Sequence, residues 1–317
     1  ALTPDLKGLH YLTCANQVQL DKSNHAPGVE NGGTMFSYSP FEVYRCCQHN
    51  VSHGWPYYAE ELWLATADNG LCASLYAASE VSAKVGDGST VKIVEETGYP
   101  FSDSVALRIS AAQAVDFPLY LRIPRWCEKP AVKVNGKRLS LKGQPLSYAI
   151  IKRTWNDGDT VTLHLPMHIA VRTWEKNHNA VSVDYGPLTF SLKIGEQWLQ
   201  YGQNSAWPEW ELLPTTSWNY GLVLNERNPA KSFDAVRKPG PILANPFTPG
   251  TVPITLRAKA KKIPAWKIDN LGLVGKLQDS PVQSDEPTET VTLIPMGAVC
   301  LCISAFLVIG AGKNTRQ

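Results

Sequence analysis

Short apolar runs separated by turn residues constrain the fold of this chain more than any other feature. Several of these runs alternate apolar with polar residues, and Gly, Pro, Asn and Asp lie between them. The clearest are at 91–95, 105–111, 119–123, 131–134, 148–153 and 160–165. Alternation of this kind is typical of strands with one buried face, and the regular spacing of turns is typical of a β-sandwich. The sequence therefore predicts a mainly β fold.

Two Asn-Gly pairs indicate tight hairpins within this region. Asn69-Gly70 lies between strand-like runs at 61–66 and 71–76, and Asn135-Gly136 follows the run at 131–134. Both residue types tolerate the positive φ angles that such turns require. Further strands are expected at 181–193 (interrupted by Tyr185-Gly186-Pro187), 254–260, 291–294 and 299–306.

The pattern changes along the chain and predicts three regions. Residues 1–60 are irregular except for one helix, which runs from about Cys46 into the aromatic residues that end at Tyr58. Pro56 is expected to break or restart this helix. Residues 61–195 are predicted to form a β-sandwich, and residues 196–317 a second, less regular β domain.

Charge and hydropathy exclude two classes of partner. The formal net charge is +2, from 30 basic and 28 acidic residues, so no strong field attracts nucleic acid or an anionic membrane. The longest apolar run, 298–310, has 13 residues. A helix of that length is too short to span a bilayer, and we expect a buried strand there.

The cysteines point to reduced thiols. There are seven, an odd number without the spacing of a small disulfide framework. Cys300 and Cys302 alternate within an apolar run, which favours core packing. Cys46 and Cys47 are adjacent, so their Cα atoms are about 3.8 Å apart, closer than the roughly 4.4–6.8 Å of an ordinary disulfide. A thiolate ligand or nucleophile is therefore considered for this pair.

The predicted position of this pair, at the start of a helix, favours thiolate over thiol. Arg45 would act in the same direction, while Glu42 and His49 add ligand types that suit zinc. However, a closed zinc site needs four ligands, and adjacent helical side chains diverge by about 100°. From the residues alone, a metal or catalytic site and a pair of packed thiols both stay open.

Other candidate sites carry weaker signals. The remaining histidines show no metal-ligand spacing, and the sequence holds no nucleophile elbow, phosphate-binding glycine loop or paired CxxC motif. Glu60 and Glu61 are neighbours only in sequence, since on a helix they point to different sides. Most of the ten tryptophans are expected in the core, although an exposed one could stack on a sugar.

A series of motifs carries a resemblance that spans most of the chain. It comprises Tyr44-Arg45-Cys46-Cys47-Gln48-His49-Asn50, Trp63-Leu64-Ala65-Thr66, Asp68-Asn69-Gly70-Leu71, Ser74-Leu75-Tyr76, Leu121-Arg122-Ile123-Pro124-Arg125-Trp126, Val134-Asn135-Gly136, Trp155-Asn156-Asp157-Gly158-Asp159, Tyr185-Gly186-Pro187-Leu188 and Val291-Thr292-Leu293-Ile294-Pro295. In order and spacing the chain resembles the β-L-arabinofuranosidase-like family, glycoside hydrolase family 127 and its relatives.

The resemblance implies a retaining glycoside hydrolase with a zinc-bound cysteine nucleophile. By motif position, Cys46 matches the nucleophile, which also binds zinc, and Cys47 matches a second zinc ligand. In that family the acid/base glutamate and a Glu-x-Cys ligand pair lie in an (α/α)6 barrel that precedes this segment. No Glu-x-Cys occurs here.

We therefore expect the chain to correspond to the carboxyl-terminal portion of such an enzyme, with a helical barrel domain upstream and residues 1–60 as its last elements. The expected partner is an L-arabinofuranoside-like glycan. Zinc is expected only if the upstream ligands are present, and the isolated chain is expected to have little or no activity. The alternative is a non-catalytic carbohydrate-binding or structural accessory β-sandwich module, since the Trp and Tyr content and the strand pattern would suit either role.

Overall fold

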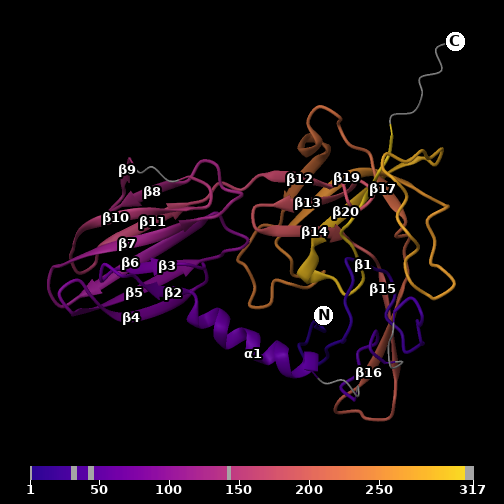
Figure 1. Cartoon of the computed structure of the whole chain (residues 1–317), viewed down its shortest axis with the longest axis horizontal. Helices are drawn as coiled ribbons and strands as arrows, with labels where there is room; N and C mark the ends of the chain where they lie inside the picture. Colours follow the sequence, from indigo (N-terminus) through magenta and orange to yellow (C-terminus); the bar gives the residue numbers. More distant parts are fainter. Residues whose placement is uncertain (1, 30–33, 42–45, 141–143, 311–317) are drawn as a thin grey trace. The chain divides into compact units, whose positions relative to one another are not determined.

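The computed structural model describes residues 2–29, 34–41, 46–140 and 144–310. The described chain is mainly β, as predicted, and its α-helical residues all belong to helix α1, Cys46–Glu60 (Figure 1). Contacts divide the chain into two compact units. One comprises residues 51–168, and the other combines residues 1–50 with residues 169–317.

The unit of residues 51–168 is a β-sandwich. One sheet has the strand order β10-β7-β3-β2, and the other has the order β4-β5-β6-β11-β8-β9. The strands are β2 Trp63–Ala65, β3 Leu71–Ala73, β4 Ser79–Val85, β5 Ser89–Thr97, β6 Ser104–Ala111, β7 Val115–Ile123, β8 Ala131–Val134, β9 Lys137–Leu139, β10 Ser147–Trp155 and β11 Thr160–His164. The predicted β-sandwich is confirmed.

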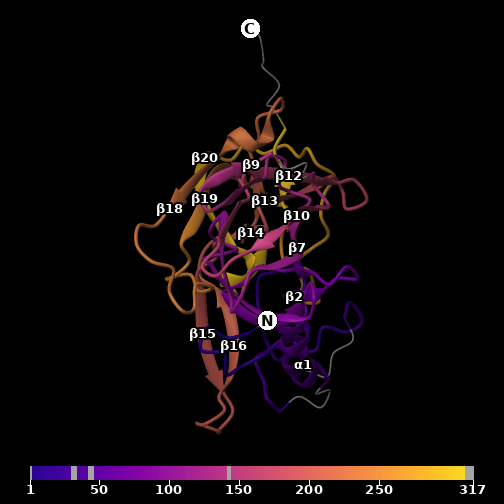
Figure 2. The same ribbon diagram turned by 90° about the vertical axis from the view of Figure 1, so that its left-hand side faces the viewer.

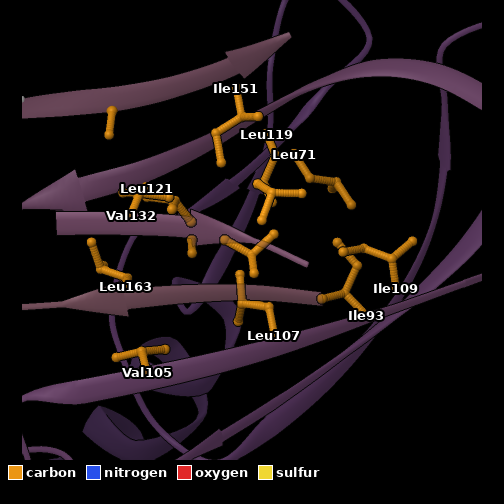
Figure 3. Packing of buried hydrophobic residues seen from close by; sticks show 14 of the residues in the cluster. Leu71, Ile93, Val105, Leu107, Ile109, Leu119, Leu121, Val132, Ile151 and Leu163 are labelled. Atoms are coloured by element: carbon orange, nitrogen blue, oxygen red, sulfur yellow. The ribbon is translucent and has the colours of Figure 1, made fainter. Parts of the chain in front are cut away.

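The sandwich core forms because alternate residues of each strand point inward. In β7 the inward residues are aliphatic or aromatic throughout, and Leu119 and Leu121 have no exposed surface. Figure 3 shows them among side chains from several strands, including Ile93, Leu107 and Ile151, that gather in one cluster. Burial of apolar side chains is the main favourable term in folding, so this layer stabilises the unit.

The two predicted hairpins are present. Asn135 and Gly136 have φ angles of 49° and 76° and connect β8 to β9, with Val134 opposite Lys137. Asn69 has a φ of 57° in the turn between β2 and β3. Both strands of this second hairpin are shorter than the predicted runs, 61–66 and 71–76.

The second unit contains an eight-stranded sheet. Its order is β12-β13-β14-β20-β19-β17-β22, with β18 also paired to β19. The strands are β12 Ile169–Trp174, β13 Ala180–Tyr185, β14 Leu188–Leu192, β17 Tyr220–Leu222, β18 Phe233–Arg237, β19 Ile254–Lys262, β20 Thr288–Pro295 and β22 Leu307–Val308. The predicted strands at 254–260 and 291–294 are thereby confirmed.

Two strand pairs accompany this sheet. β1, Asn16–Gln17, pairs with β21, Cys302–Ile303, so the first and last parts of the chain lie side by side. β15, Glu196–Tyr201, and β16, Glu209–Pro214, form a hairpin that extends from the sheet (Figure 2). Short 3₁₀ helices, η1 Pro229–Ser232 and η2 Met296–Ala298, lie in the connections.

The boundaries of the two compact units differ from those of the predicted domains, which are 1–60, 61–195 and 196–317. Strands β12 to β14 join the later sheet because Phe190 of β14 pairs with Pro295 of β20. Tyr185-Gly186-Pro187 forms the turn between β13 and β14, with Gly186 at a φ of 55°. Local strand pattern does not say which sheet a strand joins, and this long-range pairing decides it.

The apolar run at 298–310 is buried but is not the single long strand that we predicted. It contains the end of η2 and the short strands β21 and β22, which join different sheets. Leu301, Ile303 and Phe306 have no exposed surface. Apolarity therefore predicted burial correctly, whereas the strand is broken because the chain changes sheet within the run.

Helix α1 confirms the helix predicted from about Cys46. Pro56 lies inside it and does not end it. The aromatic residues Trp55 and Tyr58 do not reach a core in the described chain, since they are exposed by 63% and 43%. No described helix is both long and apolar enough to cross a membrane. That residues 1–60 complete a helical barrel stays a prediction.

Candidate functional site

The cysteine pair begins helix α1, as predicted. Cys46 and Cys47 are its first two residues, and no acidic residue lies in its first turn. The orphan backbone N–H groups and positive end of the helix dipole at this position favour negative charge on a neighbouring side chain. Arg45 and Glu42, two of the groups predicted to assist, lie outside the described residues.

Tyr11 lies beside Cys46. The Tyr11 hydroxyl oxygen is 3.1 Å from the Cys46 sulfur, and the thiol is exposed. A hydroxyl that donates to a sulfur stabilises the thiolate. This hydrogen bond, aided by the thiol of Cys47 and by backbone N–H groups, lowers the pKa of Cys46.

The pKa of Cys47 is shifted in the opposite direction to that of Cys46. Its side chain is half-buried, and burial together with the charge of Cys46 raises its pKa. Two negative charges side by side disfavour each other, so ionisation of one thiol opposes ionisation of its neighbour. In the chain without a metal, Cys46 is therefore the more readily ionised and more accessible of the two thiols.

The described residues do not complete a zinc site. Within the four described stretches, no group of three or more His, Cys, Asp or Glu side chains is placed to hold a metal ion. His49, which sequence reasoning considered beside the pair, lies three residues after Cys46 and is exposed. Two adjacent thiols supply half of a tetrahedral set at most, so the donors present do not fit zinc by themselves.

Cys127, Cys300 and Cys302 lie in places suited to packing. None of the seven cysteines forms a disulfide. Burial raises the pKa values of Cys127, Cys300 and Cys302 to about 11, so these thiols stay neutral near pH 7. The packing role predicted for Cys300 and Cys302 agrees with this environment.

Several histidines are held by hydrogen bonds within the fold. His10 Nδ1 lies 2.6 Å from the carbonyl oxygen of Leu12, and burial lowers the His10 pKa to about 4. His25 Nε2 lies 2.9 Å from Asp21 Oδ1. His164 Nδ1 lies 3.5 Å from Ser104 Oγ. These contacts position the rings rather than gather them into a site.

Sequence reasoning did not include Tyr11 in the candidate site. It lies 35 residues before Cys46, in a segment without regular secondary structure. No periodicity or motif linked the two positions, so only the folded chain brings them together. Glu60 and Glu61, the paired carboxylates considered from the sequence, lie exposed at the far end of α1.

The family model of the β-L-arabinofuranosidase GH127 middle domain matches residues 70–167. This range lies within the β-sandwich and does not include Cys46 or Cys47. No curated protein matches the sequence.

Three solved structures share the fold. A GH127 β-L-arabinofuranosidase from Geobacillus stearothermophilus T6 is 23% identical, with a TM-score of 0.63 over 97% of this chain and 43% of that chain. A protein described as a glycoside hydrolase is 20% identical, with a TM-score of 0.66 over 98% and 46% of the two chains. A GH127 β-arabinofuranosidase is also 20% identical, with a TM-score of 0.64 over 98% and 43%.

The chain thus spans less than half the length of these three proteins. The resemblance predicted from the sequence is confirmed. The β-L-arabinofuranosidase-like family, GH127, is the family that this chain resembles, through the family model at residues 70–167 and in fold over nearly its whole length.

Proposed function

We propose that this chain is the carboxyl-terminal part of a retaining glycoside hydrolase that acts on β-L-arabinofuranosides or related glycans. The observation that carries this proposal is the match of the GH127 middle-domain model to residues 70–167. The shared fold with proteins described as β-L-arabinofuranosidase, glycoside hydrolase and β-arabinofuranosidase supports it.

In this proposal Cys46 is the nucleophile. Its sulfur is exposed at the start of α1, where a substrate can reach it. The thiolate attacks the anomeric carbon, a sulfur–carbon bond forms, and the bond to the leaving oxygen breaks. That oxygen must take up a proton, and water must later displace the sulfur with help from a base. The hydroxyl of Tyr11 beside the Cys46 sulfur favours the thiolate, which is a positioning role.

Cys47 is proposed as a thiolate ligand of zinc, together with Cys46. Because the described residues supply only these two thiols at this place, the remaining ligands would come from outside them. The predicted helical barrel would provide those ligands and the acid/base glutamate. When bound, zinc would keep both sulfurs deprotonated near neutral pH.

The first test is the activity of the chain by itself. We expect no turnover of p-nitrophenyl β-L-arabinofuranoside above the buffer rate, because a missing general acid/base commonly costs about 10²–10⁴-fold. Cys46→Ala is the test variant and Cys14→Ala, at another exposed thiol, is the control. Turnover that Cys46→Ala abolishes and Cys14→Ala retains would contradict the predicted inactivity of the isolated chain.

The second test concerns the thiols as ligands. In a protein that joins this chain to the predicted helical part, we expect bound zinc to be lost on substitution of Cys46 or Cys47 by Ala and retained in Cys14→Ala. Elemental analysis after dialysis measures the ratio of zinc to protein. Zinc that is retained in both Cys46→Ala and Cys47→Ala would overturn the ligand assignment.

A further inference from the structure

A hollow of about 310 Å³ lies in the unit that combines residues 1–50 with 169–317. Its wall is formed by Arg172 and Trp174 of β12, Ser182 and Asp184 of β13, and Thr189 of β14. The rest of the lining comes from Asn177 and from Ala15, Ser304 and Ala305 beside the β1–β21 pair. None of these residues belongs to the candidate site at Cys46.

The sheet register explains why these side chains gather. Residues two apart on a strand share a face, and so do residues directly opposite on neighbouring strands. Arg172 lies opposite Ser182, and Asp184 lies opposite Thr189. The arrangement therefore follows from regular strand pairing rather than from a mobile loop.

Hydrogen bonds fix most of the polar groups in place. Thr189 Oγ1 donates to Asp184 Oδ1 over 2.7 Å, and Trp174 Nε1 donates to Ser182 Oγ over 3.0 Å. Arg172 Nη2 lies 3.3 Å from Asp184 Oδ2. The guanidinium also lies over the indole ring of Trp174, 5.1 Å from its centroid. The wall is thus organised before any ligand arrives, which lowers the entropic cost of binding.

The side chains in this wall still present accessible groups. Trp174 is 44% exposed, and the Arg172 side chain is 60% exposed. A guanidinium carries five N–H donors, and a carboxylate accepts about four hydrogen bonds. The contacts above use only part of that capacity, so donors, acceptors and an aromatic surface remain for a ligand.

The charge balance of the hollow selects among ligands. Arg172 and Asp184 form an ion pair. An anion attracted by Arg172 would also be repelled by Asp184, and a cation attracted by Asp184 would be repelled by Arg172. A neutral molecule rich in hydroxyl groups can both donate to Asp184 and accept from Arg172, while its C–H face packs on Trp174. The volume lies near the lower end of the usual range for small-ligand sites, which fits one or two sugar rings.

We propose that this hollow is a binding subsite for neutral carbohydrate, with Trp174 and Arg172 as its wall and Asp184 as an acceptor for sugar hydroxyls. The subsite does not depend on the proposed role of Cys46. It would serve to hold a glycan on the protein whether or not the chain contributes to catalysis.

Titration of the ¹⁵N-labelled full chain with sugars tests the proposal. The probes are methyl β-L-arabinofuranoside, L-arabinose, and oligosaccharides of arabinose, xylose, galactose and glucose, with inorganic phosphate as an anionic comparator. We expect at least one sugar to shift the indole N–H signal of Trp174 saturably. This signal is identified by its absence from the spectrum of Trp174→Ala.

Variants separate the subsite from other positions. Trp174→Ala should weaken sugar binding by about tenfold or more, because it removes the aromatic surface on which the sugar packs. Arg172→Met should weaken it by about tenfold through lost hydrogen bonds to a charged donor. Trp207→Ala, which removes an exposed tryptophan elsewhere, and Cys46→Ala should leave binding unchanged.

If Trp174→Ala fails to fold, Arg172→Met still tests the proposed subsite. The Arg172 side chain is mostly exposed, so its replacement should leave the fold intact. The proposal is overturned if no sugar shifts the Trp174 signal, if binding persists in both wall variants, or if phosphate binds more tightly than every sugar. Loss of binding in Cys46→Ala alone would place the sugar at the cysteine site and would also overturn it.

Discussion

The two units are both built from β-sheet, yet they differ in the sequence range of the contacts that assemble them. In the β-sandwich of 51–168, strands β4, β5 and β6 pair in chain order. In the other unit, the Asn16 side chain bonds to Ser304 and Ala305, almost 290 residues away. A sheet built from close neighbours in sequence is predictable from strand pattern, whereas contacts of this length arise only in the folded chain.

One thiol from each unit gives a further comparison. Cys127 of the sandwich is buried, and burial raises its pKa to about 11. Cys46 of the other unit is exposed beside Tyr11, which lowers its pKa. Thiols with pKa values raised by burial occur in both units, since Cys300 and Cys302 belong to the second unit, whereas the candidate nucleophile lies only in the unit assembled from distant segments. Four experiments test how far this contrast extends.

The largest effect is expected from Trp155→Ala in the sandwich. Trp155 has no exposed surface, and its Nε1 donates to the Phe117 carbonyl over 3.0 Å. Loss of a buried tryptophan costs about 3–5 kcal/mol. In urea unfolding followed by circular dichroism, the 51–168 unit should unfold earlier. The rate of Cys46 alkylation should stay unchanged below that transition.

Trp207→Ala is the control, because this side chain is exposed by 53% and its loss should change stability little. A single transition in Trp155→Ala, with Cys46 alkylation accelerating at the same urea concentration, would show that the two units unfold together. The contrast between them would then not extend to stability.

The next effect concerns Glu95, a carboxyl group at an inward position of β5. It is 1% exposed, and its Oε1 accepts a hydrogen bond from the Ala77 N–H over 3.0 Å. Its Oε2 has no hydrogen-bond partner in the described chain. Burial raises the pKa of Glu95 from 4.5 to about 8. The folded protein therefore keeps a proton that the unfolded chain releases.

Because the folded form binds more protons at Glu95, the contribution of this group to stability should fall as pH rises from 4.5 to about 8 and should be fully present below that window. The slope is at most about 1.4 kcal/mol per pH unit. Urea unfolding at several pH values measures it. Glu95→Gln should remove the slope, and Glu96→Gln, at the exposed neighbouring position, should keep it. An equal slope in both variants would assign the pH dependence to other groups.

Asn16→Ala tests the long-range contacts of the other unit. The Asn16 amide donates to the Ala305 carbonyl and accepts from the N–H groups of Ser304 and Ala305. Their loss should destabilise this unit by about 1–3 kcal/mol. Hydrogen exchange of the β1 and β21 amides measures this loss of stability. Asn204→Ala, whose side chain bonds only within two or three residues, should have a smaller effect, and equal effects would contradict the contrast.

The smallest effect is expected from Tyr11→Phe. Without the hydroxyl, the pKa of Cys46 should rise, and alkylation by iodoacetamide at pH 7.5 in metal-free protein should slow by a few-fold. Peptide mass spectrometry gives the rate at each cysteine, with Cys14 as the internal control. An unchanged rate at Cys46 would remove Tyr11 from the candidate site.

Much of the fold was predictable because it depends on local pattern. The Asn135-Gly136 hairpin, the β-sandwich and the helix from Cys46 each follow from residues near one another in sequence. The hairpin of β15 and β16 was missed because its strands contain Trp, Glu and Gln without clear alternation. Pro56 did not end the helix because one missing N–H donor does not prevent the turns on either side from forming.

The sequence alone determined the β class, the resemblance to GH127 and the adjacency of two thiols at a helix start. Only the tertiary structure decided that β12 to β14 join the last strands, that Tyr11 lies beside Cys46, and that Trp174, Arg172 and Asp184 line one hollow. The physical reason is the difference in the sequence separation over which these interactions act. Backbone propensity and turn chemistry act over a few residues, whereas sheet membership and the neighbours of a side chain depend on how distant segments pack.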